Sequence, residues 1–122
     1  MVNGYVLVEG MRVGARLENL PLQLRKIERY RVPAAASQQP DVWTTVEFEF
    51  VDGDADAVAA ALAEVLLKEG GWYTNFTLGD DVVVIFAGRI FRYRRGDGTS
   101  RAEAAAYGRS AGVPEAQLDW AE

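Results

Sequence analysis

The chain has 122 residues, of which 49% are hydrophobic and 25% are charged, as in an ordinary globular domain. Its formal net charge of −5 opposes long-range attraction to nucleic-acid phosphates and to anionic membranes. It contains no cysteine and no histidine, which excludes disulfides, zinc sites of the Cys/His type, cysteine nucleophiles and histidine general bases. Carboxylate, tyrosine, lysine and hydroxyl groups are the side-chain chemistry that remains.

Residues 1–122 are expected to form a single domain located in the cytoplasm. No stretch reaches the ~18 consecutive apolar residues of a membrane-spanning helix. The start of the chain has a glutamate and lacks the apolar block of a signal peptide. The segment 33–40 begins and ends with proline and has no apolar periodicity, which predicts a mobile loop rather than a domain linker.

The first two segments are expected to be strands. Residues 4–13 alternate between apolar and polar side chains, with a break or bulge near Gly10. Residues 17–32 are ambiguous, because their apolar residues fit both helical spacing and a period of two. Charged residues interleave with Ile27 and Tyr30 in the second half, which favours a half-exposed strand that ends at Pro33.

The middle of the chain predicts a strand followed by a helix. Residues 43–51 alternate cleanly, with valine and phenylalanine on one face and Glu47 and Glu49 on the other. A helix is expected from about residue 52 to Glu69, because an apolar stripe recurs at steps of three and four residues and Gly70 follows as a stop. The stripe consists of Val58, Leu62, Val65 and Leu66.

The last part of the chain predicts three strands, a helix and a docked tail. Residues 72–78, 82–87 and 89–95 are separated by turn residues and suit an antiparallel meander, whose middle strand is apolar on both faces. Ser100 and Glu103 have the spacing of a capping box for an alanine-rich helix that runs to about residue 111. The tail, residues 113–122, is expected to dock through Leu118 and Trp120.

The element order is therefore β-β-β-α-β-β-β-α, which predicts an α+β fold. We expect a mostly antiparallel sheet of five to six strands with both helices packed on one of its faces. The alanine-rich helix can approach the sheet closely because its side chains are small.

Three aspartates at alternating positions resemble the start of a calcium-binding loop. Asp52, Asp54 and Asp56 would supply the first three ligands, but Ala57 stands where the loop needs glycine and Ala63 where it needs a bidentate glutamate. Carboxylates at a helix N-terminus, where the dipole favours negative charge, explain all three. The sequence predicts no metal site and no cofactor.

The segment between the last strand and the last helix is the candidate anion site. Backbone N–H groups, hydroxyls and guanidinium groups could converge there on a phosphate or carboxylate. The candidate residues are Arg94, Arg95, Gly98, Thr99, Ser100 and Arg101. Asp97 places a negative charge where the anion would bind, so a turn followed by a capped helix is the favoured interpretation.

Two segments interleave basic and aromatic residues, 25–31 and 89–95, as in some nucleic-acid-binding sheets. They would form one basic face if they were neighbours. All charges between residues 32 and 67 are acidic, and cross-strand pairing with glutamates would use the same arginines. The sequence therefore disfavours nucleic acid as a partner.

Four aromatic residues form the candidate interface. Trp43, Trp72, Tyr73 and Trp120 fit core positions, but tryptophan is rarely fully buried and is enriched at interfaces. If they form an exposed apolar edge, it would serve dimerisation or the binding of another protein.

No catalytic residue is predicted. Without histidine or cysteine, an enzyme would depend on a carboxylate and a tyrosine, and no carboxylate stands in an apolar setting that would raise its pKa. The preferred interpretation is a non-catalytic binding or interaction module, with a homodimer or another protein as partner. Two alternatives stay open: a small-molecule pocket protein or an enzyme that uses carboxylate and tyrosine, and an anion or nucleic-acid binder that uses Arg89–Arg101.

Overall fold

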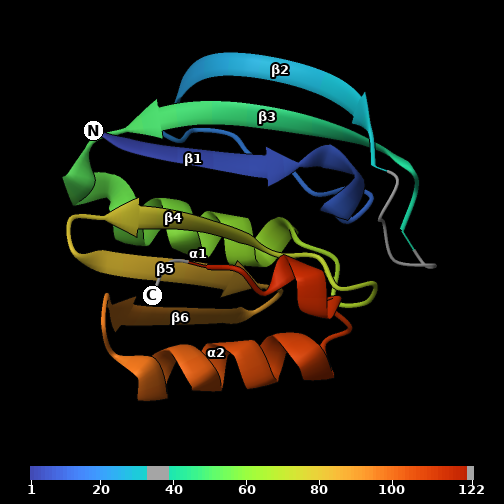
Figure 1. The fold of residues 1–122 in the computed structure, drawn as a ribbon. Coiled ribbons are helices and arrows are strands. Elements are labelled where there is room, and N and C mark those ends of the chain that lie inside the picture. The colour runs from blue at the N-terminus through green and yellow to red at the C-terminus, as the bar shows by residue number, and fades with distance from the viewer. Residues whose placement is uncertain (33–38, 121–122) are drawn as a thin grey trace.

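The fold contains two antiparallel sheets of three strands and two α-helices, in a computed structural model that describes residues 1–32 and 39–120 (Figure 1). The strand orders are β1-β3-β2 and β4-β5-β6. The strands are β1 (Val2–Leu7), β2 (Gln23–Arg31), β3 (Val42–Phe50), β4 (Thr74–Leu78), β5 (Asp81–Phe86) and β6 (Arg89–Arg94). The predicted α+β class and element order are confirmed. A mobile loop was expected at 33–40, and residues 33–38 of this segment lie outside the described residues.

The expectation of a single continuous sheet is wrong. β1 lies beside β4 (Figure 1), but side chains connect these two strands. The Thr74 hydroxyl donates to the carbonyl oxygen of Tyr5 at 2.6 Å, and the Tyr5 hydroxyl donates to Asn75 Oδ1 at 2.9 Å. The Thr74 hydroxyl therefore bonds to a backbone carbonyl that the hydrogen-bond ladder of a continuous sheet would have used. Within the described residues, the sheets meet at a seam between β1 and β4 that has no backbone ladder.

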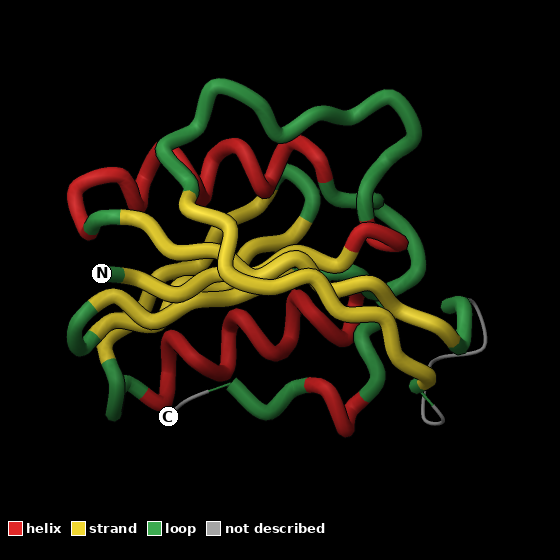
Figure 2. Tube along the Cα trace, turned by 90° about the horizontal axis from the view of Figure 1, so that it is seen from above, coloured by secondary structure: helices red, strands yellow, loops and turns green. Residues whose placement is uncertain are grey.

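The expectation that both helices cover one face is also wrong. The helices α1 (Ala55–Val65) and α2 (Gly98–Ser110) lie on opposite sides of the strands (Figure 2). α1 shares a buried cluster with Val83 and Ile85 of β5, and α2 shares a second cluster with the alternate residues Val82 and Val84. Because β5 is apolar on both faces, each face needs its own cover.

α1 ends at Val65, four residues before the expected end. The backbone becomes extended at Leu66, which forms a β-bridge with Met11. The Arg12 N–H donates to the Val65 carbonyl at 2.8 Å, and the Leu67 N–H donates to the Gly10 carbonyl at 2.7 Å. These bonds to a distant segment stabilise the extended conformation over further helical turns. Neither α1 nor α2, the two α-helices of the described chain, has the length and apolar run that a lipid bilayer requires.

The ambiguous segment 17–32 contains a strand in its second half. β2 is an outer strand that pairs only with β3 in the described chain, and all nine of its residues are exposed. Arg25 forms an ion pair with Glu49, and Lys26 forms one with Glu47 at 3.0 Å, so the basic residues of β2 pair across strands as expected. β2 and β6 are outer strands of different sheets, so they do not join into one basic face.

The Thr74 hydroxyl stabilises the seam, and its removal tests that role. Thr74→Val keeps the shape of a side chain that is 1% exposed but leaves the carbonyl of Tyr5 without this donor. We expect the free energy of unfolding to fall by about 1–3 kcal/mol in urea denaturation. Thr77→Val, the same change at an exposed position of β4, should have little effect. Equal effects of the two substitutions would contradict a role of the hydroxyl at the seam.

Candidate functional site

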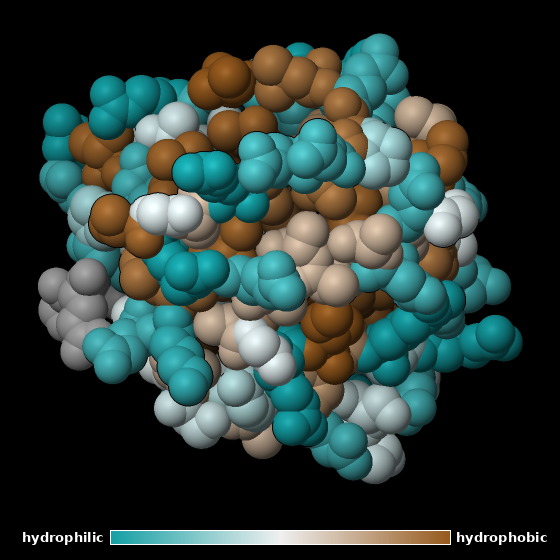
Figure 3. All heavy atoms as spheres, turned by 180° about the vertical axis from the view of Figure 1, so that it is seen from behind, coloured by the Kyte–Doolittle hydropathy of each residue, from teal (hydrophilic) through white to brown (hydrophobic). Residues whose placement is uncertain are grey.

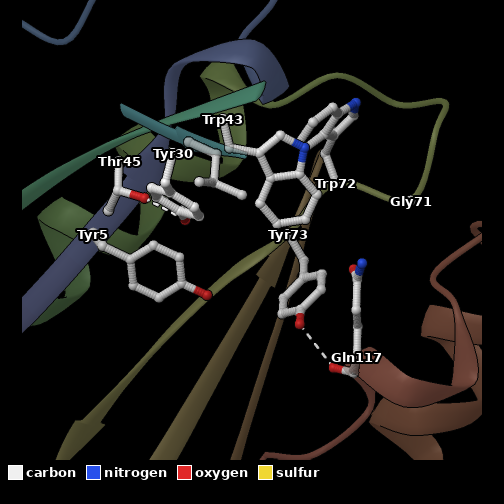
Figure 4. A pocket seen from close by; sticks show the side chains of 9 residues that line it. Tyr5, Tyr30, Trp43, Thr45, Gly71, Trp72, Tyr73 and Gln117 are labelled. Atoms are coloured by element: carbon white, nitrogen blue, oxygen red, sulfur yellow. Dashed lines mark hydrogen bonds between the residues drawn. The ribbon is translucent and has the colours of Figure 1, made fainter. Parts of the chain in front are cut away.

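An aromatic pocket with a volume of about 220 Å³ opens where the face of the β1-β3-β2 sheet opposite α1 meets the tail that follows α2. For scale, a cavity of about 150 Å³ holds benzene. Residues of the β1-β3-β2 sheet, of the segment just before β4 and of the tail line the pocket (Figure 4). The lining residues are Tyr5, Leu7, Tyr30, Trp43, Thr45, Gly71, Trp72, Tyr73 and Gln117.

Strand register brings the upper wall together. Tyr30 of β2 stands opposite Trp43 of β3, and Leu7 of β1 stands opposite Thr45. Side chains of one strand alternate between faces, so Tyr5 shares the face of Leu7. Residues of different strands that are 13 to 40 positions apart in the sequence thereby face the same space.

The lower wall depends on two close backbone segments. Trp72 and Tyr73 enter the pocket immediately before β4, after Gly70 and Gly71 at φ values of +96° and +75°. A Cβ atom at Gly71 would lie 2.7 Å from the carbonyl carbon of Gly112 and closer still to its oxygen. Only glycine allows this approach. The contact brings the tail, with Gln117, to the edge of the pocket.

The tyrosine hydroxyls and the Trp43 indole N–H of the pocket have partners inside the protein. Each of the three tyrosine hydroxyls forms a hydrogen bond, two of which are drawn in Figure 4. The bonds are Tyr5 to Asn75 Oδ1 (2.9 Å), Tyr30 with Thr45 Oγ1 (2.7 Å) and Tyr73 to the Gln117 carbonyl (2.7 Å). The indole N–H of Trp43 donates to the carbonyl of Pro40 at 2.9 Å. The walls of the pocket therefore present mainly ring surface.

Tyr5 and Tyr73, two of the tyrosines of the pocket, stay neutral at physiological pH. Burial raises the pKa of Tyr5 to about 12, and the negative charges of Asp119 and of an ionised Tyr30 add to the shift. Burial raises the pKa of Tyr73 as well, with further contributions from Tyr5 and Asp119. A tyrosine with a raised pKa is a poor general base. No carboxylate is among the described residues that line the pocket.

Alkaline pH tests the burial of Tyr5. The pKa of Tyr5 is higher in the fold than the ordinary value of 10.0, so the stabilisation is complete below pH 10 and is lost as the pH rises through about 12. We expect a loss on the order of 2 kcal/mol in the free energy of unfolding over this range. Urea denaturation at several pH values should show that the free energy of unfolding falls less in Tyr5→Phe than in the unchanged protein. The same loss in both proteins would show that Tyr5 is not the cause.

The four residues of the candidate interface fall into two environments. Trp72 and Trp120 are 5% and 3% exposed, so they present almost no surface to a partner. Trp43 and Tyr73 are half-buried and line the pocket. The Trp43 ring lies 5.5 Å from that of Trp72, and the Tyr73 ring lies 5.6 Å from that of Trp120. Whether Trp43 and Tyr73 contact another protein stays a prediction.

Sequence reasoning identified three of the pocket residues but missed Tyr5 and Tyr30. Both stand on strands whose alternation had been recognised. Tyr5 was assigned to a strand as an ordinary alternating position, and Tyr30 was read as part of a basic strand. The signal that could have found them is the coincidence of aromatic residues on one face of three expected strands, but it needs the strand order.

The residues of the candidate anion site are engaged within the protein. Asp97 Oδ1 accepts from the Ser100 N–H at 3.1 Å and Oδ2 accepts from the Ser100 hydroxyl at 2.8 Å, so Asp97 caps α2 instead of the expected Ser100. These bonds lower the pKa of Asp97. The Arg101 guanidinium donates to the carbonyl oxygens of Trp120 and Leu118.

The remaining members of that group are exposed. Arg94, Arg95, Gly98 and Thr99 surround no closed site, although a hollow of about 290 Å³ lies between Gly98 and Arg101. Arg94 lies 3.9 Å from Asp81, within the range of an ion pair. The carboxylate of Asp97 already occupies the N-terminus of α2, and this geometry favours the capped turn over an anion site.

The aspartates before α1 do not gather around a metal. Asp52 and Asp54 form a short 3-10 turn ahead of the helix, and Asp56 lies 3.8 Å from Arg92. Among the described residues, no group of three or more potential ligands could hold a metal ion.

No protein-family model matches the chain, and searches of curated proteins and of solved structures found no match either. Of the candidate sites, the aromatic pocket is the one that three strands, the segment before β4 and the tail build together.

Proposed function

We propose that this protein is a non-catalytic binding module and that the aromatic pocket is its ligand site. The observation that carries the proposal is the convergence of five aromatic side chains on one space of about 220 Å³. Such pockets, mostly apolar with a few fixed polar groups, are the usual form of small-molecule sites. The volume suits a small ligand or the head group of a larger one.

The chemistry of the walls supports binding without catalysis. Tyr5 and Tyr73 are neutral, all three tyrosine hydroxyls form hydrogen bonds, and no carboxylate or lysine is among the described residues that line the space. Aromatic rings supply contact area and orientation but no proton transfer. A ligand held there would be released unchanged.

The experiment uses the three tryptophan indole N–H signals in NMR spectra of the intact protein. Trp43 and Trp72 line the pocket, whereas Trp120 packs outside it and serves as an internal control. A fragment library with neutral, cationic and anionic members should contain compounds that shift the first two signals and leave the third unchanged. Native mass spectrometry of freshly purified protein adds a test for a retained ligand. If no compound shifts the Trp43 and Trp72 signals, or if the shifts fall elsewhere, the proposal fails.

A second copy of the chain is the second candidate partner, and the exposed side of β2 favours it. Leu24 and Ile27 are each 60% exposed, and apolar side chains gather near the top of the view from behind, where β2 lies (Figure 3). Outer strands with free backbone groups and apolar side chains pair readily with other strands. Two antiparallel copies of β2 centred on Ile27 would place Lys26 opposite Glu28. The same register opposes Arg25 to Arg29, and the ion pair of Arg25 with Glu49 within each copy offsets part of this repulsion.

Native mass spectrometry over a range of concentrations tests this second candidate. A dimer in the unchanged protein that is lost in Ile27→Lys would support pairing through β2. Val13→Lys is the matched control, because Val13 is a fully exposed apolar residue outside the strands. A monomer at every concentration, or equal effects of the two substitutions, would exclude the dimer.

A further inference from the structure

Five aromatic rings line the aromatic pocket. Tyr30 and Trp43 come from the β1-β3-β2 sheet, whereas Trp72 and Tyr73 come from the segment that precedes β4 (Figure 4). The face of an aromatic ring carries partial negative charge and attracts a cation within about 6 Å of its centre. Among the described residues that line the pocket, none is a lysine or an arginine.

The hydrogen bonds of the pocket disfavour ligands that need many polar contacts. The three tyrosine hydroxyls and the Trp43 indole N–H are already bonded within the protein. A sugar or a carboxylate would leave much of its hydrogen-bonding capacity unmet between these rings. A quaternary ammonium group has no N–H, so it loses no hydrogen bond there.

The charge around the pocket also selects against anions. Asp119 directly precedes Trp120, whose ring lies 5.6 Å from that of Tyr73, and its negative charge raises the pKa of Tyr5 and Tyr73. The whole chain carries a net charge of −5. A cation is therefore attracted both by the ring faces and by the field of the protein.

From these observations we infer that the aromatic pocket binds a quaternary ammonium head group, in which the nitrogen carries four alkyl groups and no hydrogen. The inference rests on the proposed function, because it names the ligand class of the same pocket. The ring faces surround the alkyl groups, which contribute apolar contact, while the positive charge interacts with the rings without a hydrogen bond.

The test compares choline with 3,3-dimethylbutan-1-ol, an uncharged molecule of the same shape. Both are titrated into the intact protein while the indole signals of Trp43 and Trp72 are followed. Choline should bind about tenfold more tightly than the neutral alcohol. If the alcohol binds as tightly as choline, the inference fails while the proposed binding function stands. If choline does not bind at all, the inference also fails, and the fragment experiment decides the proposed function separately.

A pair of substitutions at Tyr30 separates the effect of the ring from that of the hydroxyl. Tyr30 is 38% exposed, so changes there should preserve the fold. Tyr30→Phe keeps the ring and should bind choline within about twofold of the unchanged protein, whereas Tyr30→Leu should lose several-fold in affinity. The loss in Tyr30→Leu should be smaller for the neutral alcohol. An equal loss for both ligands would show that the ring acts through apolar contact alone and would overturn the inference.

Discussion

Replacing Phe86 by alanine is expected to lower the free energy of unfolding by about 3–5 kcal/mol. Phe86 is the last residue of β5, is 2% exposed and lies at the centre of the cluster beneath α2. Its ring contacts four other aromatic rings at centroid distances between 4.9 and 6.2 Å. Removal of the ring would leave a cavity bordered by large rigid side chains, which cannot collapse to fill it.

Urea denaturation of Phe86→Ala should show this loss as a shift of the midpoint. Ile90→Ala is the control on the adjacent strand. Ile90 is 41% exposed, and its truncation should change the free energy of unfolding by less than about 1 kcal/mol. A loss below about 1 kcal/mol for Phe86→Ala would show that the cluster under α2 contributes little to stability.

Replacing Gly71 by alanine should also have a large effect, about 2–5 kcal/mol of lost stability. Two causes add here. The residue has a φ of +75°, which side chains disfavour, and the new Cβ would collide with the backbone of Gly112. Backbone atoms cannot move aside as the end of a flexible side chain can, so the tail would have to shift. Gly71 lines the aromatic pocket, so ligand affinity should fall together with stability.

Gly79→Ala separates the two causes. Gly79 also has a positive φ, +61°, but a Cβ there meets no atom within 4 Å. Its replacement should cost about 1–2 kcal/mol, the conformational part alone. Thermal and urea denaturation of both variants measure the difference. Equal losses for the two glycines would contradict the close contact between residue 71 and the tail.

The local elements of the fold were predictable because each depends on a short pattern. The alternation in β3 and the helical stripe of α1 are visible within about ten residues, and both elements formed. The end of α1 was not predictable, because the bridge between Leu66 and Met11 joins segments 55 residues apart in the sequence. Local pattern recognition has no access to such a competing pairing.

The placement of the helices shows what one pattern already contained. β5 was recognised as apolar on both faces, yet both helices were expected on one side. A strand buried on both faces requires cover on both. The buried side chains of α1 and α2 meet alternate residues of this strand, as that requirement demands.

The aromatic pocket was the least predictable feature. Trp43, Trp72 and Tyr73 were recognised as residues that could face a partner, but their shared space depends on strand order. Tyr5 and Tyr30 join them only because β1 and β2 flank β3. A one-residue change of register would turn either tyrosine to the opposite face.

The seam between β1 and β4 has a consequence for the width of the pocket. Within the described residues, no backbone ladder fixes the angle between the two sheets, so side chains such as Asn75 and Thr74 set it together with α1. Because the pocket takes one wall from the β1-β3-β2 sheet and another from the segment that leads into β4, a small rotation of one sheet against the other would open or narrow it. Substitutions at the seam can therefore alter ligand selectivity without changing any residue that the ligand touches.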